Sequence, residues 1–413
     1  MGLNATPKGE RIQIGVFGKT NAGKSSLLNQ ITNQDLSIVS AVKGTTTDPV
    51  YKAMEILPLG PVLLVDTPGL DDDSDLGSLR VDKAKAVLRN TDLALLVVDC
   101  RQMEDLRWER ELEQVLLDRK ISYLWVYTHC DLVEKLPAAS ENSVFVSCQT
   151  GQGIENLKNQ LAKLVPQEKE RPLVRDLLVR QAVVVLVVPI DAAAPKGRLI
   201  LPQQQVIRDV LEAGGIPIVV KDTELPYIFS GNFPRPDVVI TDSQVFEQVA
   251  RIVPQDVPMT SFSILMARYK GNLERLARNV EVLDTLQDGD CILMAEGCTH
   301  HRQCGDIGTV KLPNWIRQHT KKKIQFDTTS GTGFPAELSP YRMVIHCGGC
   351  MLQKKEMQYR MKLAQEQGVP MVNYGIAIAY LKGILQRSMS WVAKQEGKAY
   401  TDTYDSKSAE ENS

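Results

Sequence analysis

One segment constrains the fold more than any other: Gly18 to Ser25 reads GKTNAGKS and fits the pattern GxxxxGK[ST]. It follows an apolar run at residues 12–17 (IQIGVF) and precedes residues 25–31 (SSLLNQI), which favour a helix. In that setting, glycines let backbone N–H groups curl around phosphate oxygens, and the helix N-terminus adds positive partial charge. The segment therefore predicts a strand, a phosphate-binding loop and a helix that together begin an α/β domain.

The same segment predicts how a nucleotide and its magnesium ion are held. Lys24 should reach the β- and γ-phosphates, and the Ser25 hydroxyl should bind Mg²⁺. Asp66 ends an apolar strand and opens Asp66-Thr67-Pro68-Gly69, so it should hold the ion through water, while the Gly69 amide contacts the γ-phosphate. The loop residues expected at the phosphates are Gly18, Asn21, Ala22, Gly23, Lys24, Ser25 and Ser26.

Further features of this region concern hydrolysis. Gly44 to Asp48 (GTTTD) is a threonine-rich switch loop, in which resemblance to translation-factor-like GTPases assigns Thr46 to the magnesium shell, with Thr45 as the alternative. Leu70 stands where Ras-like enzymes have a water-orienting glutamine. Asn21 matches the asparagine that binds K⁺ in potassium-dependent GTPases similar to the tRNA-modification enzyme MnmE, so potassium stimulation is expected. Lys24, Thr46 and Gly69 are the catalytic candidates.

The base-reading element departs from the usual pattern. After the strand at residues 121–127, Thr128-His129-Cys130-Asp131 stands where Asn-Lys-x-Asp is expected. The Asp131 carboxylate can accept two hydrogen bonds from the guanine edge, which adenine cannot donate. Without the lysine stem, and without the asparagine that ties this loop to the phosphate-binding loop, we expect weaker affinity or looser discrimination. Ser147 and Cys148 begin the segment that replaces Ser-Ala-Lys, and the Cys148 amide should meet guanine O6.

The chain length and the spacing of patterns predict several domains. A chain of 413 residues is too long for one core. Apolar runs at residues 62–66, 93–98, 122–127 and 144–147 alternate with helical stretches, which indicates a mostly parallel sheet. A small α/β block without a polar constellation follows, best interpreted as a dimerisation or packing module. The expected parts are a P-loop GTPase domain (1–168), a dimerisation domain (173–258), an α/β cluster-binding domain (259–395) and a disordered tail (396–413).

A second set of chemistry-bearing residues lies in the last third of the chain. Cys298-Thr299-His300 and His346-Cys347-Gly348-Gly349-Cys350 each follow a predicted strand. A zinc site usually shows two CxxC pairs, but only one is present. A dithiol at Cys347 and Cys350 would not need Cys298. An iron–sulfur cluster on the three cysteines is the preferred interpretation, with His300, His346 or Glu296 as candidates for the exchangeable fourth ligand.

Composition restricts the partners and the compartment. The net charge is only −2 and the pI about 6.3, so no basic field exists to hold nucleic acid or an acidic membrane surface. The sequence contains no run of about 18 apolar residues, so it predicts no membrane span. Eight cysteines without an export signal are expected to be reduced thiols, and the protein is expected in the cytoplasm.

The order of these motifs resembles the FeFe-hydrogenase maturation GTPases, the HydF family, over residues 12 to about 391. The resemblance implies a scaffold and carrier whose 4Fe–4S cluster, on Cys298, Cys347 and Cys350, is the platform for a transient two-iron unit. Two radical SAM maturases would assemble that unit, and apo FeFe-hydrogenase would receive it. The central domain would hold a homodimer, and GTP hydrolysis would gate partner binding or release.

Two other function classes compete with this interpretation. An RNA- or ribosome-associated GTPase of the MnmE-like group should carry a KH, OB or strongly basic domain, and the sequence shows none. A zinc-bearing regulatory GTPase would have no carrier role. Anaerobic purification separates the alternatives, since a brown protein with a cluster EPR signal supports the maturase, and a colourless protein with stoichiometric zinc excludes it.

Overall fold

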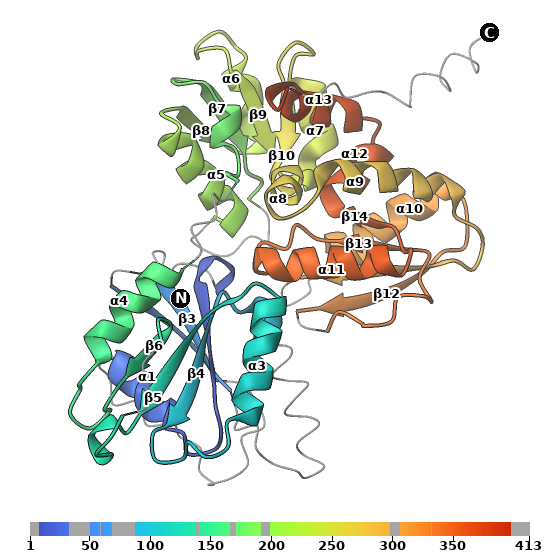
Figure 1. Cartoon of the computed structure of the whole chain (residues 1–413). Coiled ribbons are helices and arrows are strands. Elements are labelled where there is room, and N and C mark those ends of the chain that lie inside the picture. Colours follow the sequence, from blue (N-terminus) through green and yellow to red (C-terminus); the bar gives the residue numbers. More distant parts are fainter. Residues whose placement is uncertain are drawn as a thin grey trace. The chain divides into compact units, whose positions relative to one another are not determined.

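The computed structural model describes residues 8–32, 50–57, 59–67, 87–136, 140–165, 171–190, 199–297, 306–331 and 333–397 (Figure 1). The chain divides into two compact units, residues 1–169 and residues 170–413. Among the described residues, no helix is both long enough and apolar enough to cross a membrane.

The first unit is built on a six-stranded sheet in the order β2-β3-β1-β4-β5-β6. Neighbouring strands are parallel, except that β2 pairs antiparallel with β3. Every residue of β4 is buried, as a parallel strand covered on both faces requires. The strands are β1 (Ile12–Phe17), β2 (Val50–Ile56), β3 (Gly60–Asp66), β4 (Leu93–Asp99), β5 (Ser122–Thr128) and β6 (Ser143–Phe145).

Helices cover both faces of this sheet (Figure 1). Helices α1 (Lys24–Thr32) and α4 (Ile154–Leu164) pack on one face. Helix α3 (Arg107–Asp118) covers the other, because Leu112 and Leu116, four residues apart, lie on the same side of the helix. Two 3₁₀ turns complete the unit, η1 (Lys8–Glu10) and η2 (Cys130–Leu132).

The second unit contains two four-stranded sheets, each with parallel neighbours, in the orders β10-β9-β7-β8 and β12-β11-β13-β14. Strand β10 directly follows the domain boundary expected at residue 258, yet it pairs with β9 and so completes the first of these sheets. The strands are β7 (Val183–Val187), β8 (Ile216–Val220), β9 (Val238–Thr241), β10 (Met259–Ser261), β11 (Cys291–Glu296), β12 (Gln325–Ser330), β13 (Met343–His346) and β14 (Met371–Asn373).

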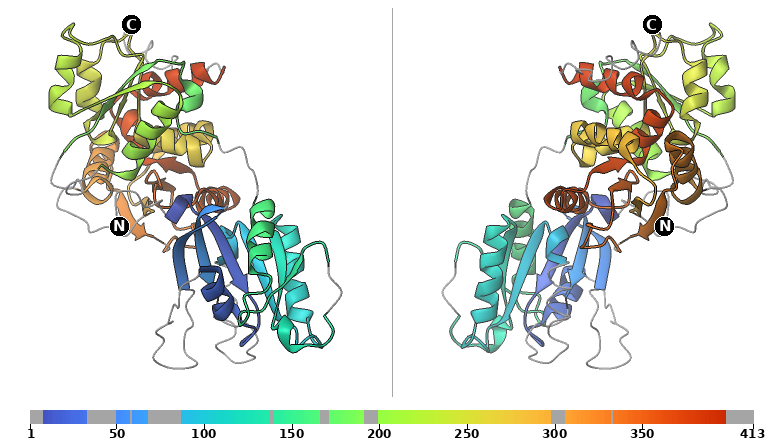
Figure 2. Two further views of the ribbon diagram at one scale, coloured as in Figure 1. Left: turned by 90° about the vertical axis from the view of Figure 1, so that its left-hand side faces the viewer. Right: turned by 90° about the vertical axis from the view of Figure 1, so that its right-hand side faces the viewer.

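A single hydrophobic core runs through the second unit from Leu173 to Val392. Helix α8 contacts β10 of one sheet and β14 of the other (Figure 2). The α-helices are α5 (Leu201–Glu212), α6 (Leu225–Ile228), α7 (Phe246–Ile252), α8 (Phe262–Lys270), α9 (Leu273–Arg278), α10 (Leu312–Thr320), α11 (Lys354–Glu366), α12 (Tyr374–Leu381) and α13 (Leu385–Gln395). Shorter turns are η3 (Arg175–Leu177), η4 (Asp222–Glu224), η5 (Ser243–Val245), η6 (Asn279–Thr285) and η7 (Ile307–Lys311).

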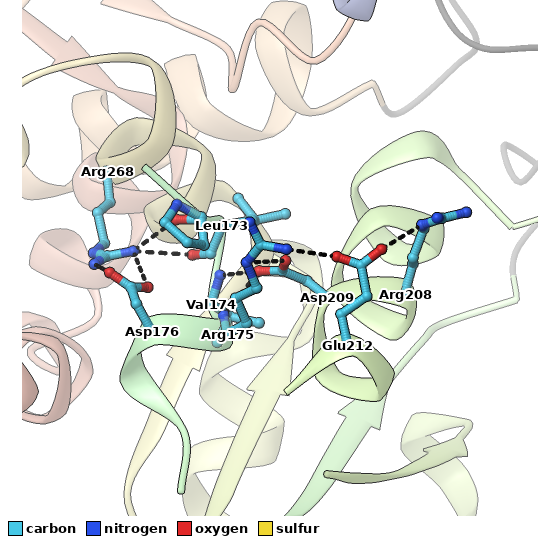
Figure 3. Close-up of polar contacts among 9 residues, drawn as sticks. Leu173, Val174, Arg175, Asp176, Arg208, Asp209, Glu212 and Arg268 are labelled. Carbon is cyan, nitrogen blue, oxygen red and sulfur yellow. Dashed lines mark hydrogen bonds and ion pairs between the residues drawn. The ribbon is translucent and has the colours of Figure 1, made fainter. Parts of the chain in front are cut away.

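A buried arginine fixes the segment that begins the second unit (Figure 3). The Arg268 side chain of α8 is 1% exposed and donates to the carbonyl oxygens of Pro172 at 2.9 Å and Leu173 at 3.3 Å. It also pairs with both carboxylate oxygens of Asp176. Its Nε lies 2.6 Å from Glu396, directly after α13. Arg268 therefore joins the first turn of the unit to its last helix.

Helix α5 holds the other side of the same segment (Figure 3). The Asp209 carboxylate accepts the backbone N–H groups of Val174 at 2.6 Å and Arg175 at 2.8 Å. Glu212 accepts from the Arg175 guanidinium at 2.7 Å and from Arg208 at 2.8 Å. Because α5 and α8 bind it together, the segment has a defined path into the core.

Candidate functional site

The predicted phosphate-binding loop connects β1 to α1, as expected from the sequence. The backbone has positive φ at Asn21, 62°, and at Gly23, 87°. At Gly18 the constraint is space, because a Cβ there would lie 2.4 Å from the carbonyl oxygen of Val97 in β4. Glycine is thus needed at one end for close approach and at the other for a left-handed backbone. Ala22 is buried, whereas Ser26 is exposed.

Lys24 lies within the loop that it is expected to serve. Its side chain is buried, and Nζ donates to the carbonyl oxygens of Gly18 at 2.8 Å and Lys19 at 2.7 Å. These bonds hold the ammonium group at the loop. A phosphate group entering the loop would find this cation already in place.

Ser25 and Asp66 lie together at the ends of α1 and β3. The Ser25 hydroxyl donates to Asp66 Oδ2 at 3.0 Å, and the buried Oδ1 has no hydrogen-bond partner among the described residues. Burial raises the pKa of Asp66, and the Ser25 hydrogen bond and the charges of Lys24 and Lys52 only partly offset this. A carboxylate with a spare oxygen beside a hydroxyl fits Mg²⁺, a cation that prefers oxygen ligands.

The base-reading element keeps its connection to the phosphate-binding loop, contrary to the expectation from the sequence. Thr128 ends β5, and its buried hydroxyl donates to the carbonyl oxygen of Ala22 at 2.8 Å. The same oxygen lies 3.2 Å from the carbonyl oxygen of Val98. A threonine hydroxyl therefore supplies the contact that we expected to be lost with the asparagine. The effect on guanine affinity stays a prediction.

His129 lies beside the same loop, at the place of the usual lysine. Its Nδ1 is 3.3 Å from Asp99 Oδ2 and 3.2 Å from the Thr128 hydroxyl. Burial alone would raise the pKa of Asp99, but the hydrogen bonds from Arg101 and the charge of His129 outweigh burial and lower it. The carboxylate beside the imidazole is therefore ionised at neutral pH.

The other three base-reading residues, Asp131, Ser147 and Cys148, lie in two loops that are joined to each other. Asp131 is exposed, in η2, and Ser147 is buried with its Oγ accepting the Thr150 N–H at 3.2 Å. The two loops are joined by a bond from the Cys130 N–H to the Val146 carbonyl at 3.4 Å. Burial, assisted by the charges of Asp131 and Cys130, raises the pKa of Cys148 to about 11. The Cys148 side chain is therefore a neutral thiol at neutral pH.

The strands that precede the two cysteine segments end side by side in the second sheet of unit two. Strands β11 and β13 are parallel neighbours, with Ala295 opposite His346. Gly297 follows the end of β11, and Cys347 follows the end of β13. The Cys347 N–H donates to the Ala295 carbonyl at 2.8 Å, which brings the two strand ends together.

Backbone N–H groups point at the cysteine sulfurs. Cys347 Sγ accepts from Gly297 N at 3.1 Å and from Gly349 N at 3.4 Å. Burial nevertheless raises the pKa of Cys347 to about 11, and it also raises that of Cys350, which the charge of Lys270 partly offsets. Such half-buried thiols become thiolates when a metal replaces the proton, and amide donors then stabilise the anionic sulfur. Among the described residues, no group of three or more His, Cys, Asp or Glu side chains could hold a metal ion, so a sulfur-ligated centre here would need ligands from other residues.

Two glycines are required at this edge by space and backbone geometry. A Cβ on Gly297 would lie 2.9 Å from the Leu352 side chain. Gly349 has φ of 61°, and a Cβ there would lie 2.7 Å from the sulfur of Met357. Larger residues would push apart the two amides that face Cys347.

His346, a candidate ligand from the sequence, uses both ring nitrogens elsewhere. Nδ1 lies 2.8 Å from the Cys347 carbonyl oxygen, and Nε2 lies 3.0 Å from Nη1 of Arg360. Since Arg360 can only donate, Nε2 accepts and Nδ1 carries the proton. Complete burial and the charge of Arg360 lower the pKa of His346 to about 3. We therefore do not retain it as a cluster ligand.

Glu296 ends β11 and remains close to the cysteines. It is buried, and its negative charge contributes to the raised pKa of Cys347. A Cβ placed on Gly308 would lie 2.5 Å from Glu296 Oε1 and 2.4 Å from the Tyr374 hydroxyl, so these groups line the same small space.

Several expected site residues lie outside the described residues: Thr45, Thr46, Gly69, Cys298 and His300.

Two buried cations near the cysteines were not identified from the sequence. Arg360 of α11 binds His346, the Glu356 carboxylate at 2.9 Å and the Gly331 carbonyl at 2.6 Å. Lys270 of α8 binds three carbonyl oxygens of residues 349–352. Periodicity gives no signal for either, because lysine and arginine on a helix are ordinarily read as exposed residues.

Comparison with protein families divides the chain into three consecutive matches. Residues 13–129 match the 50S ribosome-binding GTPase family, residues 173–271 the hydrogen maturase F dimerization domain, and residues 274–391 the hydrogen maturase F tetramerization domain. The first match supports GTP hydrolysis, with GTP and Mg²⁺ at the site described above. The other two suggest self-association of the chain.

Curated relatives include tRNA modification GTPases MnmE. That of Xanthomonas euvesicatoria pv. vesicatoria (strain 85-10) is 35% identical over 167 residues, 39% of this chain and 36% of the relative. That of Legionella pneumophila (strain Paris) is 31% identical over 157 residues, 38% of this chain and 35% of the relative. The chain thus spans about a third of the length of these relatives, and the likeness is distant GTPase homology.

Solved structures that match part of the chain include a probable GTP-binding protein engB and the G domain of the T. maritima FeoB iron transporter. The first is 20% identical to this chain with a TM-score of 0.32, and the match covers 38% of this chain and 100% of the engB chain. The second has TM-score 0.29 and 22% identity, with the same coverage. Neither likeness bears on function.

By the order and placement of its three family matches, the chain has the domain architecture of the HydF hydrogenase maturases and belongs with them.

Proposed function

We propose that this maturation GTPase is a scaffold and carrier that binds a 4Fe–4S cluster and delivers a two-iron unit to apo FeFe-hydrogenase. The observation that carries the proposal is the environment of Cys347, whose sulfur accepts N–H groups from Gly297 and Gly349 where two strands end. Amide donors of this kind favour an anionic sulfur ligand. In a chain with the HydF architecture, an iron–sulfur centre is the group that best uses them.

The cluster ligands in this proposal are Cys298, Cys347 and Cys350, with Glu296 or His300 as the exchangeable fourth. Three thiolates leave one iron open to such a ligand. Glu296 is favoured by its burial and by its electrostatic influence on Cys347. The protein's own contribution is to orient the amides of Gly297 and Gly349 toward sulfur.

In the nucleotide site, Lys24 would bind the β- and γ-phosphates, while Ser25 and Asp66 would hold the magnesium ion. Thr46, or Thr45 in its place, would complete the magnesium shell, and the Gly69 amide would contact the γ-phosphate. Asn21 is exposed in the loop with a left-handed backbone, a position from which its side chain could bind K⁺ beside the phosphates. Hydrolysis at equal rates in K⁺ and Na⁺ would refute the potassium proposal.

The partners in the proposal are a second copy of the chain, two radical SAM maturases and apo FeFe-hydrogenase, and hydrolysis would gate their binding or release. Self-association as a homodimer is supported by β8, an edge strand in its sheet that leaves Ile216 51% and Val219 44% exposed. The domain limits 1–168, 173–258 and 259–395, with a tail from 396 to 413, stay a prediction, except that β10 (Met259–Ser261) joins the sheet of the second domain and moves that boundary past residue 261.

The deciding experiment is anaerobic reconstitution with iron and sulfide, followed by incubation with the radical SAM maturases and apo FeFe-hydrogenase. We expect a brown protein with about four irons per chain and a cluster EPR signal, and then recovery of hydrogenase activity. A colourless protein that holds stoichiometric zinc would contradict the proposal. A protein that takes up the cluster but never activates the hydrogenase would leave a GTPase with a cluster and no carrier role.

A further inference from the structure

The cysteine turn is held from inside the protein by a buried ammonium group. Lys270 is the last residue of α8 and is 2% exposed. Its Nζ donates to the carbonyl oxygens of Gly349 at 2.7 Å, Cys350 at 3.1 Å and Leu352 at 2.6 Å. These three carbonyls belong to the turn that contains Cys350.

Such a placement is costly unless it is compensated. A buried ammonium loses its hydration, so its donors must find acceptors inside the protein. Here three carbonyl oxygens from one turn take that role, and hydrogen bonds from a charged donor are stronger than neutral ones. The position at the C-terminal end of α8 adds a favourable interaction with the helix dipole. The lysine and the turn therefore stabilise each other.

The carbonyl bonds also determine where the amides of the turn point. In a planar trans peptide, the C=O of one residue and the N–H of the next point in opposite directions. With the Gly349 and Cys350 carbonyls turned toward Lys270, the N–H groups of Cys350 and Met351 must face the other side. Hydrogen bonds from these two N–H groups offset part of the effect of burial, which raises the pKa of the Cys350 thiol. The lysine thus orients the amides that a thiolate at Cys350 needs.

We propose that Lys270 is a positioning residue of the cysteine site, which fixes the 349–352 turn so that its amides face Cys350 and supplies a fixed positive charge behind the thiolates. This inference rests on the proposed function, because the ligand that it serves is the 4Fe–4S cluster. Arg268, two residues earlier on α8, points to a different partner set at residues 172–176 and 396. The end of α8 therefore binds two separate segments.

The first test uses the metal-free full-length chain and needs no cluster. In Lys270→Met, which removes the donors at similar length, amide hydrogen exchange of a peptide covering residues 347–353 should be about tenfold faster or more. Lys382→Met is the matched control, because Lys382 is a partly buried lysine of the same unit that binds Glu247 at 2.9 Å. It should leave that peptide unchanged. Equal exchange in Lys270→Met and wild type would overturn the inference.

The second test measures the charge. After reconstitution, the cluster in Lys270→Met should have a more negative midpoint potential than in wild type, because a nearby cation no longer stabilises the reduced form. Lys270→Gln keeps donors but loses the charge, so it should show the same direction of shift with less change in exchange. A wild-type midpoint potential in both variants would refute the role of the charge.

These two readouts separate the inference from the proposed function. If wild-type protein takes up no iron, the carrier proposal fails, while the exchange experiment still decides whether Lys270 holds the turn. If wild type takes up iron and neither readout changes in Lys270→Met, the inference fails and the carrier proposal stands. Should Lys270→Met give little folded protein, Lys270→Gln provides both measurements.

Discussion

A single hydroxyl group, that of Thr128, connects the base-reading loop to the phosphate-binding loop. Thr128→Val removes the hydroxyl at nearly constant volume and leaves the buried Ala22 carbonyl without this donor. Such a loss costs about 1–2 kcal/mol, so GTP should bind about tenfold more weakly in titration calorimetry. Thr150→Val, which changes an exposed threonine nearby, is the control. Wild-type affinity in Thr128→Val would mean that the contact does not align the two loops.

The two lysines of the phosphate-binding loop make a second comparison at this scale. Lys24 points into its own loop, whereas Lys19 bonds to the Asp105 backbone beside α3. Lys24→Ala should abolish measurable phosphate release, because the cation that balances the phosphates is lost. Lys19→Ala should retain turnover. Similar losses in both variants would indicate damage to the loop and not loss of a phosphate ligand.

At the scale of elements, α8 organises the second unit through Arg268. Arg268→Met removes the buried partner of Asp176 and Glu396 and frees the Pro172 carbonyl. Because Asp176 is partly exposed and Glu396 keeps its pair with Arg171, the free energy of unfolding should fall by about 1–3 kcal/mol. Arg208→Met removes an exposed pair on α5 and should cost less than about 0.5 kcal/mol. Urea unfolding of the full chain, followed by hydrogen exchange of α8 and α13, measures both. An equal effect of the two substitutions would contradict this role of Arg268.

Elements with long apolar runs could be predicted from the sequence, whereas polar edge strands could not. Strands β1, β4 and β5 were expected within two residues of their observed ends, because both of their faces are largely buried and their sequences are mostly apolar. Strand β12 was not predicted, because its sequence QFDTTS has no alternation of apolar and polar residues. Its pairing partner, β11, is also distant in the sequence.

In the candidate sites too, features that depend on local sequence could be predicted, whereas contacts between distant segments could not. The phosphate-binding loop is encoded locally, so its strand, turn and helix were predicted together. From the sequence alone, His346 is a candidate ligand. The sequence gives no sign that Arg360, a residue of α11, binds its Nε2. The contact of Thr128 with Ala22 joins residues far apart in the chain, so no spacing rule indicated it.

At the scale of the whole molecule, the nucleotide residues and the cysteines belong to different compact units with separate hydrophobic cores. Separate cores predict that a substitution in one site leaves the stability of the other unit unchanged. Cys347→Ala should therefore abolish iron uptake in anaerobic reconstitution, while the GTP hydrolysis rate stays within about twofold of wild type.

Lys24→Ala is the reciprocal variant, which should lose hydrolysis and keep its full iron content. Because hydrolysis is proposed to gate partners and not to drive the iron chemistry, the cluster should form equally well with or without GTP. If Cys347→Ala lost hydrolysis in a protein with wild-type unfolding behaviour, the two sites would be coupled more tightly than their separate cores allow. Nucleotide would then have to act on the cysteine site itself, and iron uptake by Lys24→Ala would fall in parallel.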